Sequence, residues 1–269
     1  MKIVTQASEL LYGCAFVPTM GALHSGHQSL FARAAEQSEK VVASIFVNPL
    51  QFENPDDLAK YPRTPERDAQ LAEESGVTHF WLPQSEEIYP PGFTKLSAGP
   101  LGEIYEGASR PGHFDGVVTV VSRLFELVRP QCAIFGEKDF QQLSLIKKIK
   151  SDVRIISAPT IRESDGLALS SRNVRLDAES RQSATVISRA LYAAVDAPDY
   201  ESARLVMREI LAGEAALTLD YAQIIDEEDF TDATTSTVSA RAIIAGWLNG
   251  IRLILSLIHI SEPTRLRRI

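Results

Sequence analysis

Apolar runs and amphipathic segments alternate along the first half of the chain. Short apolar runs predict strands at residues 2–4, 14–17, 41–47, 78–82 and 132–135. Apolar residues at helical spacing predict helices at residues 28–35, 65–75, 114–128 and 140–150. The run at 41–47 is apolar along almost its whole length, which is typical of a parallel strand covered on both faces. This alternation favours an α/β fold with an open, doubly wound, Rossmann-like parallel sheet.

The pattern changes in the second half. An amphipathic helix is predicted over 177–195, with Asp177 as its N-cap, and another over 200–211. Apolar runs at 219–225 and 242–245 predict strands. We therefore predict a Rossmann-like domain over 1–165, a smaller α+β domain over 166–255, and a tail over 256–269 that fits neither pattern. Residues 83–112 are rich in Pro and Gly and predict a long irregular excursion.

Composition narrows the function classes. The chain has 269 residues, of which 45% are hydrophobic and 23% charged, and its net charge is −8. An acidic balance argues against binding nucleic acid through the phosphate backbone. No apolar run is long enough for a membrane span, and no signal peptide is apparent. Cys14 and Cys132 each lie in an apolar run, so we expect buried free thiols and a reducing, cytoplasmic location.

A glycine-bearing turn between a strand and a helix is the first candidate site. The apolar run ends at Pro18, and Met20-Gly21-Ala22-Leu23-His24-Ser25-Gly26-His27 comes next. Strand, turn and helix start place backbone N–H groups and a helix dipole where an anion could sit. The imidazole N–H groups of His24 and His27, spaced HxGH, suit charge developing on phosphate oxygens. The HxGH motif has only four positions, so two ordinary surface or core histidines remain an alternative explanation.

Two further segments suit phosphate. Gly136-Glu137-Lys138-Asp139 follows a strand and opens a helix, so Lys138 could reach a phosphate and Asp139 a ribose hydroxyl. Leu169-Ser170-Ser171-Arg172 places hydroxyls beside a guanidinium, a set of donors that suits phosphate oxygens. The alternatives are a solvated turn with a capping Asp and a polar linker with a capping Ser.

Amide side chains suggest a second ligand. Asn48-Pro49-Leu50-Gln51-Phe52 and Gln141-Gln142 place amides beside apolar residues, and amides suit a hydroxylated substrate that must be oriented. Each could equally be a loop or surface amide. The segment 110–116 is interpreted as the loop leading into a helix. Neither a P-loop nor a GxGxxG fingerprint occurs.

Taken together, these segments resemble the pantoate–β-alanine ligase (pantothenate synthetase) family. The matching motifs stand in the family's order and cover about residues 14–175: PTMGALHSGH, FVNPLQF, YPRT, RPGHFDGVVTVV, FGEKDFQQL and DGLALSSRN. DYAQIID and AGWLNGIRL match more loosely in the second domain. The resemblance places the chain among the HxGH nucleotidyltransferases.

The resemblance implies an ATP-dependent ligase of pantothenate (coenzyme A precursor) biosynthesis. Pantoate and ATP would give pantoyl adenylate and pyrophosphate, and β-alanine would then release AMP and pantothenate. The first domain would bind ATP and pantoate, and the second would act as a lid. Mg²⁺ would accompany ATP, with no protein metal site and no tightly bound organic cofactor. The family also implies a homodimer in the cytoplasm, with no nucleic-acid or membrane partner.

Site residues follow from the same resemblance. His27 is expected as proton donor, with His24 supporting the phosphates and Lys138 and Arg172 supplying positive charge. Gln51 and Gln142 are expected to hold pantoate, with Gln51 also near β-alanine. ATP binding is expected at Met20, Gly21, Ala22, Leu23, His24, Ser25, Gly26, His27, Gly136, Glu137, Lys138, Asp139, Ile161, Leu169, Ser170, Ser171 and Arg172.

Two departures from the family pattern stand out. The segment between the first strand and PTMG is about ten residues shorter than the family implies, so a right-handed parallel crossover lacks its helix. Strand one could therefore be displaced, or the core locally exposed. The chain also leaves the pattern after about Leu253. A nucleotidyltransferase acting on another small substrate and an inactive nucleotide-binding module remain alternative functions.

Overall fold

The computed structural model describes residues 1–258. It divides into two units, Met1–Ile161 and a second that begins at Arg162. Each unit has its own sheet. No helix among the described residues is long and apolar enough to cross a bilayer.

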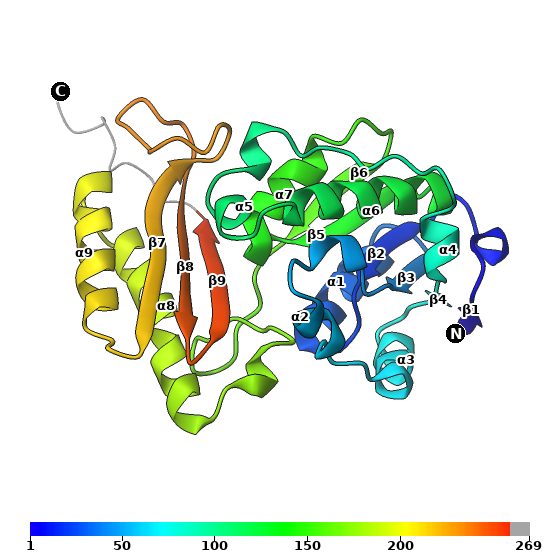
Figure 1. Ribbon diagram of the computed structural model, residues 1–269, viewed down its shortest axis with the longest axis horizontal. Coiled ribbons are helices and arrows are strands. Elements are labelled where there is room, and N and C mark those ends of the chain that lie inside the picture. The colour runs from blue at the N-terminus through cyan, green and yellow to red at the C-terminus, as the bar shows by residue number, and fades with distance from the viewer. Residues whose placement is uncertain (259–269) are drawn as a thin grey trace. The chain divides into compact units, whose positions relative to one another are not determined.

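The first unit is built on a six-stranded parallel sheet (Figure 1). Its strands are β1 (Lys2–Val4), β2 (Ala15–Thr19), β3 (Val41–Ile45), β4 (His79–Trp81), β5 (Cys132–Gly136) and β6 (Arg154–Ala158). Their order is β1-β4-β3-β2-β5-β6, and every neighbouring pair is parallel. The predicted doubly wound sheet is confirmed. Strand β6 was not predicted, because it lies at an edge and its side chains are mostly half-buried.

Helices and short turns connect these strands. The helices are α1 (Ser25–Ala35), α2 (Pro55–Ala59), α3 (Pro65–Glu74), α4 (Ser85–Ile88), α5 (Glu106–Ser109), α6 (His113–Val128) and α7 (Phe140–Lys147). The 3₁₀ turns are η1 (Ala7–Glu9), η2 (Pro49–Gln51), η3 (Pro100–Gly102) and η4 (Glu137–Asp139). All four predicted helices are present, and the excursion over 83–112 contains α4, η3 and α5. Helix α1 starts at Ser25 rather than at residue 28, so it includes His27.

The central strands are buried on both faces. Ala15 and Val17 of β2 share one apolar cluster with Phe31 and Ala34 of α1. Phe16 points to the opposite face because side chains alternate along a strand, and it is also fully buried. The buried thiols Cys14 and Cys132 belong to this core, as predicted.

The short link between β1 and β2 contains no crossing helix. Residues 5–14 make only the single turn η1, and β1 pairs with β4 at the sheet edge, so it keeps a place in the sheet. Val4 and Leu10 are buried, whereas Ile3 is 53% exposed and Tyr12 60% exposed. Two large apolar side chains of this stretch are therefore exposed, while β1 keeps its pairing at the sheet edge.

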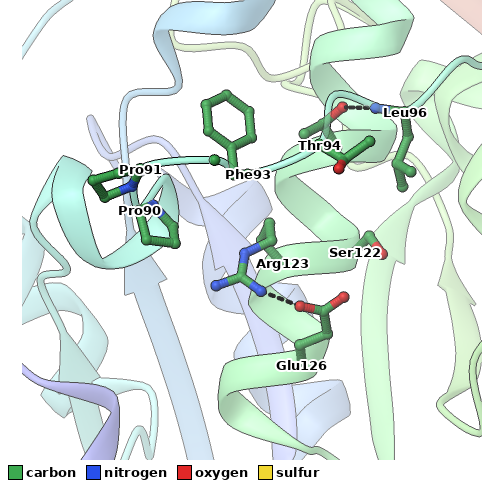
Figure 2. A pocket seen from close by; sticks show the side chains of 10 residues that line it. Pro90, Pro91, Phe93, Thr94, Leu96, Ser122, Arg123 and Glu126 are labelled. Atoms are coloured by element: carbon green, nitrogen blue, oxygen red, sulfur yellow. Dashed lines mark hydrogen bonds and ion pairs between the residues drawn. The ribbon is translucent and has the colours of Figure 1, made fainter.

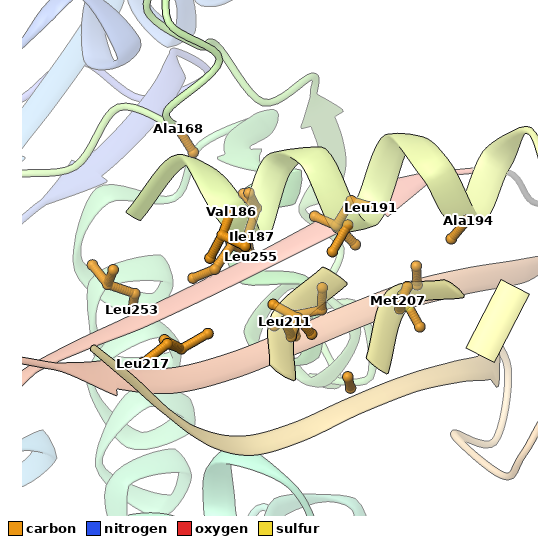
Figure 3. Packing of buried hydrophobic residues seen from close by; sticks show 14 of the residues in the cluster. Ala168, Val186, Ile187, Leu191, Ala194, Met207, Leu211, Leu217, Leu253 and Leu255 are labelled. Carbon is orange, nitrogen blue, oxygen red and sulfur yellow. The ribbon is translucent and has the colours of Figure 1, made fainter. Parts of the chain in front are cut away.

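The second unit packs two helices against a three-stranded antiparallel sheet. Its elements are η5 (Asn173–Arg175), α8 (Ala178–Val195), α9 (Tyr200–Ala212), β7 (Leu217–Asp226), β8 (Ala240–Leu248) and β9 (Ile251–Ile258), with strand order β7-β8-β9. Asp177 caps α8 as predicted, accepting the Ser180 N–H at 2.7 Å. Figure 3 shows Leu191 of α8, Met207 and Leu211 of α9, and Leu255 of β9 in one apolar cluster.

Strand β9 extends past residue 256, where the predicted tail begins. Ser256 pairs with Ile243, and Ile258 pairs with Arg241, in the antiparallel ladder with β8. Leu253 and Leu255 of the same strand are buried in the apolar cluster of the second unit. The rest of the predicted tail, 259–269, lies outside the described residues.

Candidate active site

The strand order of the first unit reverses between β2 and β5. From β2 the chain winds to β3 and β4 on one side, and later to β5 and β6 on the other. Ligands of open parallel sheets bind beyond the carboxyl ends of the strands at such a switch point. The PTMG turn follows β2, and Gly136 to Asp139 follow β5, so the topology brings these two candidate segments to the same place.

The two histidines begin helix α1. His24 is the N-cap, and its Nδ1 accepts the Gly26 N–H at 3.1 Å. The His24 N–H in turn donates to Nδ1 of His27 at 3.3 Å. This reciprocal pair is a capping box made of imidazoles, and it holds the two rings 4.2 Å apart. The HxGH spacing is thus the spacing from the cap to the third residue of a helix.

The capping bonds fix which ring nitrogens carry protons. A neutral imidazole whose Nδ1 accepts a hydrogen bond has its proton on Nε2. Burial lowers the pKa of His27 to about 3, and the charges of His24 and Lys138 contribute to the same shift. His27 is therefore neutral at pH 7, with Nε2–H as its donor.

Several backbone N–H groups of the turn have partners within the chain, and the expectation of a backbone cradle for an anion stays a prediction. The Gly21 N–H donates to Thr19 Oγ1 at 3.3 Å. The N–H groups of Ala22 and Leu23 donate to the Asp68 carboxylate at 2.9 and 2.8 Å. The turn can therefore offer a ligand hydrogen-bond donors from its side chains more readily than from the backbone amides of residues 21–24.

Lys138 supplies positive charge beside the histidines. It lies in η4, directly after β5, and its Nζ is 3.5 Å from Asp139 Oδ1. Its charge is one cause of the lowered pKa of His27, which places it in the electrostatic neighbourhood of that ring. Glu137 and Asp139 occupy the same turn, and Gly136 ends the strand.

Gln51 is held by a buried network after β3. Asn48 is 1% exposed, and its Nδ2 donates to Gln51 Oε1 at 3.0 Å and to the Gly116 carbonyl at 3.1 Å. Its Oδ1 accepts from the Leu50 N–H at 3.2 Å and from the Tyr89 hydroxyl at 2.6 Å. Gln51 Nε2 contacts Met20 Sδ at 3.1 Å, so the structure joins the amide loop to the PTMG turn.

His113 and Arg110 were not predicted as site residues. The His113 Nδ1 lies 2.9 Å from the Gln51 carbonyl, which can only accept, so Nδ1 carries the proton. Its Nε2 then accepts from Arg110 at 3.2 Å. Burial and the Arg110 charge lower the pKa of His113 to about 4. The sequence placed both residues in the loop that leads into a helix, and only the tertiary structure shows that they contact Gln51.

The remaining predicted residues are spread over both units. Gln142 lies in the first turn of α7, and its neighbour Gln141 donates to the carbonyls of Leu101 and Ile104, both at 2.8 Å. Ile161 ends the first unit and is 38% exposed. Leu169 to Arg172 form a loop in the second unit, where the Arg172 N–H donates to Ser170 Oγ at 3.3 Å. Their roles, and those of Gln142 and Ile161, stay predictions.

A separate cavity of about 310 Å³ lies between residues 90–96 and helix α6 (Figure 2). Arg123 lines it, donating to the Ile88 carbonyl at 3.0 Å and pairing with Glu126. None of the predicted site residues lines this cavity. Over residues 1–258, no cluster of three or more His, Cys, Asp or Glu side chains could hold a metal ion.

Comparison with known proteins identifies the family. The family model of pantoate–β-alanine ligase matches residues 2–258. A pantothenate synthetase of Thermus thermophilus is 46% identical over 271 residues, covering 94% of this chain and 98% of the relative. Pantothenate synthetase of Pseudomonas fluorescens is 45% identical, covering 93% of each.

Solved structures agree with this match. A crystal structure of pantothenate synthetase from Thermus thermophilus superposes with a TM-score of 0.91 at 44% identity, covering 96% of this chain and 99% of that one. The pantoate–β-alanine ligase of Francisella tularensis, complexed with beta-gamma ATP and β-alanine, has a TM-score of 0.78 at 32% identity, covering 97% and 100%. The chain belongs to the pantoate–β-alanine ligase family.

Proposed function

We propose that this chain condenses pantoate with β-alanine at the expense of ATP, through a pantoyl adenylate. Family membership supports this reaction, and the Francisella relative has been solved with beta-gamma ATP and β-alanine. The observation that carries the proposal is the pair of capped histidines beside Lys138 at the switch point of the sheet. That arrangement offers hydrogen-bond donors and positive charge to a polyphosphate.

In the first step a pantoate carboxylate oxygen attacks the α-phosphorus of ATP. The bond from that phosphorus to the bridging oxygen breaks, and pyrophosphate leaves with the electron pair. Negative charge grows on the phosphate oxygens, where the His27 Nε2–H would donate a hydrogen bond and Lys138 would supply charge. Because His27 is neutral at rest, it adds a donor without adding a second cation beside Lys138.

In the second step the β-alanine amine attacks the acyl carbon of the adenylate. The bond from that carbon to the AMP oxygen breaks, the nitrogen loses a proton, and AMP leaves. The Gln51 amide is anchored by Asn48, so it could orient a pantoate hydroxyl without itself reorganising. Gln142 would act on pantoate in the same way.

Three finer features belong to the proposal. Mg²⁺ enters with ATP as part of the substrate, as is usual for this ion at phosphates. The family resemblance supports a homodimer, which light scattering on the purified chain would measure. It also supports a cytoplasmic location, which two thiols buried in the core suit.

The test is release of AMP and pyrophosphate by the purified chain. Wild type should release pyrophosphate only when pantoate is present, and AMP and pantothenate only when β-alanine is present as well. His27→Ala should lower pyrophosphate release by about 10²- to 10⁴-fold. His79→Ala, a partly buried histidine on β4, is the matched control and should keep the wild-type rate.

Other outcomes would separate the alternatives. ATP binding without acyl adenylate would indicate an inactive nucleotide-binding module. Pyrophosphate release that requires a different small acceptor in place of pantoate would indicate a nucleotidyltransferase with another substrate. A His27→Ala variant as fast as wild type would refute the role given to that residue.

A further inference from the structure

Asp68 is a buried carboxylate behind the PTMG turn. It lies in the first turn of helix α3 and is only 1% exposed. Within residues 1–258 its hydrogen-bond donors are the Ala22 N–H at 2.9 Å, the Leu23 N–H at 2.8 Å and the Thr64 hydroxyl at 3.0 Å. A buried charge is unfavourable unless its lone pairs are satisfied. Here two backbone amides from the histidine turn satisfy it.

The turn has a conformation that an anion stabilises. Gly21 has φ +85° and Ala22 has φ +50°, so two consecutive residues are left-handed. The N–H groups of Ala22 and Leu23 reach one carboxylate from this turn. In this protein the anion is part of the chain, because Asp68 Oδ2 binds Ala22 and Oδ1 binds Leu23.

The space around the turn is closed as well. A Cβ added to Gly21 would lie 3.1 Å from Asp68 Oδ2 and 3.1 Å from Ile45 Cγ2. The turn is therefore pressed between helix α3 and the end of β3. Position and conformation of residues 21–23 both depend on the Asp68 side chain.

The histidine pair comes directly after this turn. Leu23 precedes His24, and the His24 backbone and ring make the capping box with Gly26 and His27. Fixing the N–H groups of Ala22 and Leu23 fixes where His24 enters helix α1. It thereby fixes the direction of both Nε2–H groups.

We propose that Asp68 is a positioning residue, whose carboxylate holds the His24–His27 pair in place through the backbone of Ala22 and Leu23. Its effect on catalysis rests on the function proposed above. Its effect on the turn does not, and can be measured without any substrate. If the His24–His27 pair is no longer held in place, the rate of adenylation should fall more than the affinity for pantoate.

The experiment compares four variants. Asp68→Ala removes both backbone acceptors, and Asp68→Asn keeps one acceptor oxygen. Thr64→Val removes only the hydroxyl donor and leaves both backbone contacts. Glu66→Gln is the matched control, because Glu66 is an exposed acid in the same first turn of α3.

Two readouts are recorded for each variant. Hydrogen exchange at Ala22 and Leu23 should quicken in Asp68→Asn, while exchange in β3 and α6 stays as in wild type. The kcat for pyrophosphate release should fall by about 10- to 100-fold in Asp68→Asn, with the KM for pantoate changed less than about threefold. Asp68→Ala should be at least as impaired, Thr64→Val should stay near the wild-type rate, and Glu66→Gln should match wild type.

The outcomes decide between the two proposals. Wild-type exchange and wild-type kcat in Asp68→Asn would overturn the positioning role. A uniform rise of exchange over the whole first unit would overturn it too, since Asp68 would then support the fold and not the turn. If the chain formed no adenylate at all, the proposed function would fail while the exchange result still tested the contact. Should Asp68→Ala not fold, Asp68→Asn and Thr64→Val carry the test.

Discussion

Two loops at the ends of neighbouring strands are held in different ways. The turn after β2 is fixed by a charge, because the Asp68 carboxylate binds two of its backbone N–H groups. The loop after β3 is fixed by a neutral network in which the Asn48 side chain donates twice and accepts twice. One loop is held by its main chain and the other by a side chain of its own.

The difference reflects the group that each loop presents. Backbone anchoring leaves the histidine rings to cap the helix and to donate from Nε2. In the second loop the presented residue is itself part of the network, since Gln51 receives a hydrogen bond at Oε1 and His113 contacts its carbonyl. Damage to this network should therefore directly affect the Gln51 amide, to which the proposed function assigns pantoate.

The largest effect is expected at Asn48. Asn48→Ala would remove all four hydrogen bonds of this buried amide, to Gln51, Gly116, Leu50 and Tyr89, at a cost of about 2–4 kcal/mol. Since Gln51 loses its anchor, kcat/KM for pantoate should fall by about 10²-fold. Asn48→Asp should be worse, because a carboxylate would face two carbonyl oxygens.

Steady-state kinetics with varied pantoate would measure this loss. Asn54→Ala is the matched control, since Asn54 caps α2 by accepting the Asp56 N–H at 2.8 Å. It should lower stability by about 1 kcal/mol and leave kcat/KM for pantoate unchanged. Equal pantoate kinetics in both variants would show that the neutral network does not position Gln51.

A smaller effect, visible as pH dependence, is expected at His113. Its pKa is about 4 in the fold against an ordinary value of 6.5, so the unfolded chain takes up the proton first as the pH falls. Burial and Arg110 lower the pKa, and Glu106 and Asp139 oppose them. Its share of the stability is complete above about pH 6.5 and is lost as the pH falls toward 4.

His113→Asn tests that sign, because an amide can still donate to the Gln51 carbonyl but does not titrate. Urea unfolding between about pH 6.5 and pH 4.5 should show a wild-type slope steeper by up to about 1.4 kcal/mol per pH unit than the slope of the variant. Identical slopes would mean that the fold does not lower the pKa of His113.

The smallest effect is expected at Tyr89. Burial raises its pKa, so the phenol stays protonated and donates to Asn48 Oδ1 at 2.6 Å. Tyr89→Phe removes that bond but leaves the Leu50 N–H on the same oxygen, so unfolding should become easier by about 1 kcal/mol. Tyr12→Phe, at a 60% exposed residue, is the control and should change nothing measurable. A loss at Tyr89 as large as that of Asn48→Ala would indicate that the hydroxyl is the centre of the network.

The sequence predicted the parts of the fold that have strong periodicity. The apolar run at 41–47 and the amphipathic helix over 114–128 lie close to β3 and α6. Strand β6 was not predicted. Arg154 is exposed and its neighbours are half-buried, so no continuous apolar run indicates a strand. Strand β9 was not predicted, because it is defined by its pairing with β8, which extends it to Ile258.

The candidate site could likewise be predicted only where it is built from local sequence motifs. The HxGH and GEKD segments are local motifs, and the sequence marked them. Asp68 lies 46 positions from Ala22, in a first turn where an acid is already explained by the helix dipole. His113 contacts Gln51 from 62 positions away. Such partners are defined by the tertiary structure, and no spacing in the chain encodes them.

The imidazole capping box has a consequence for how a lineage could lose this chemistry. His24 is the N-cap of helix α1 as well as a candidate site residue, so its replacement by Ala removes the imidazole ring and the helix cap together. Asn, Asp or Ser would remove only the ring, because each still offers the Gly26 N–H an acceptor. A descendant that abandoned the reaction but kept the fold is therefore expected to carry one of those three residues at position 24. The residue at position 24 would therefore distinguish a relative that lost the reaction and kept the cap of helix α1 from one that lost both.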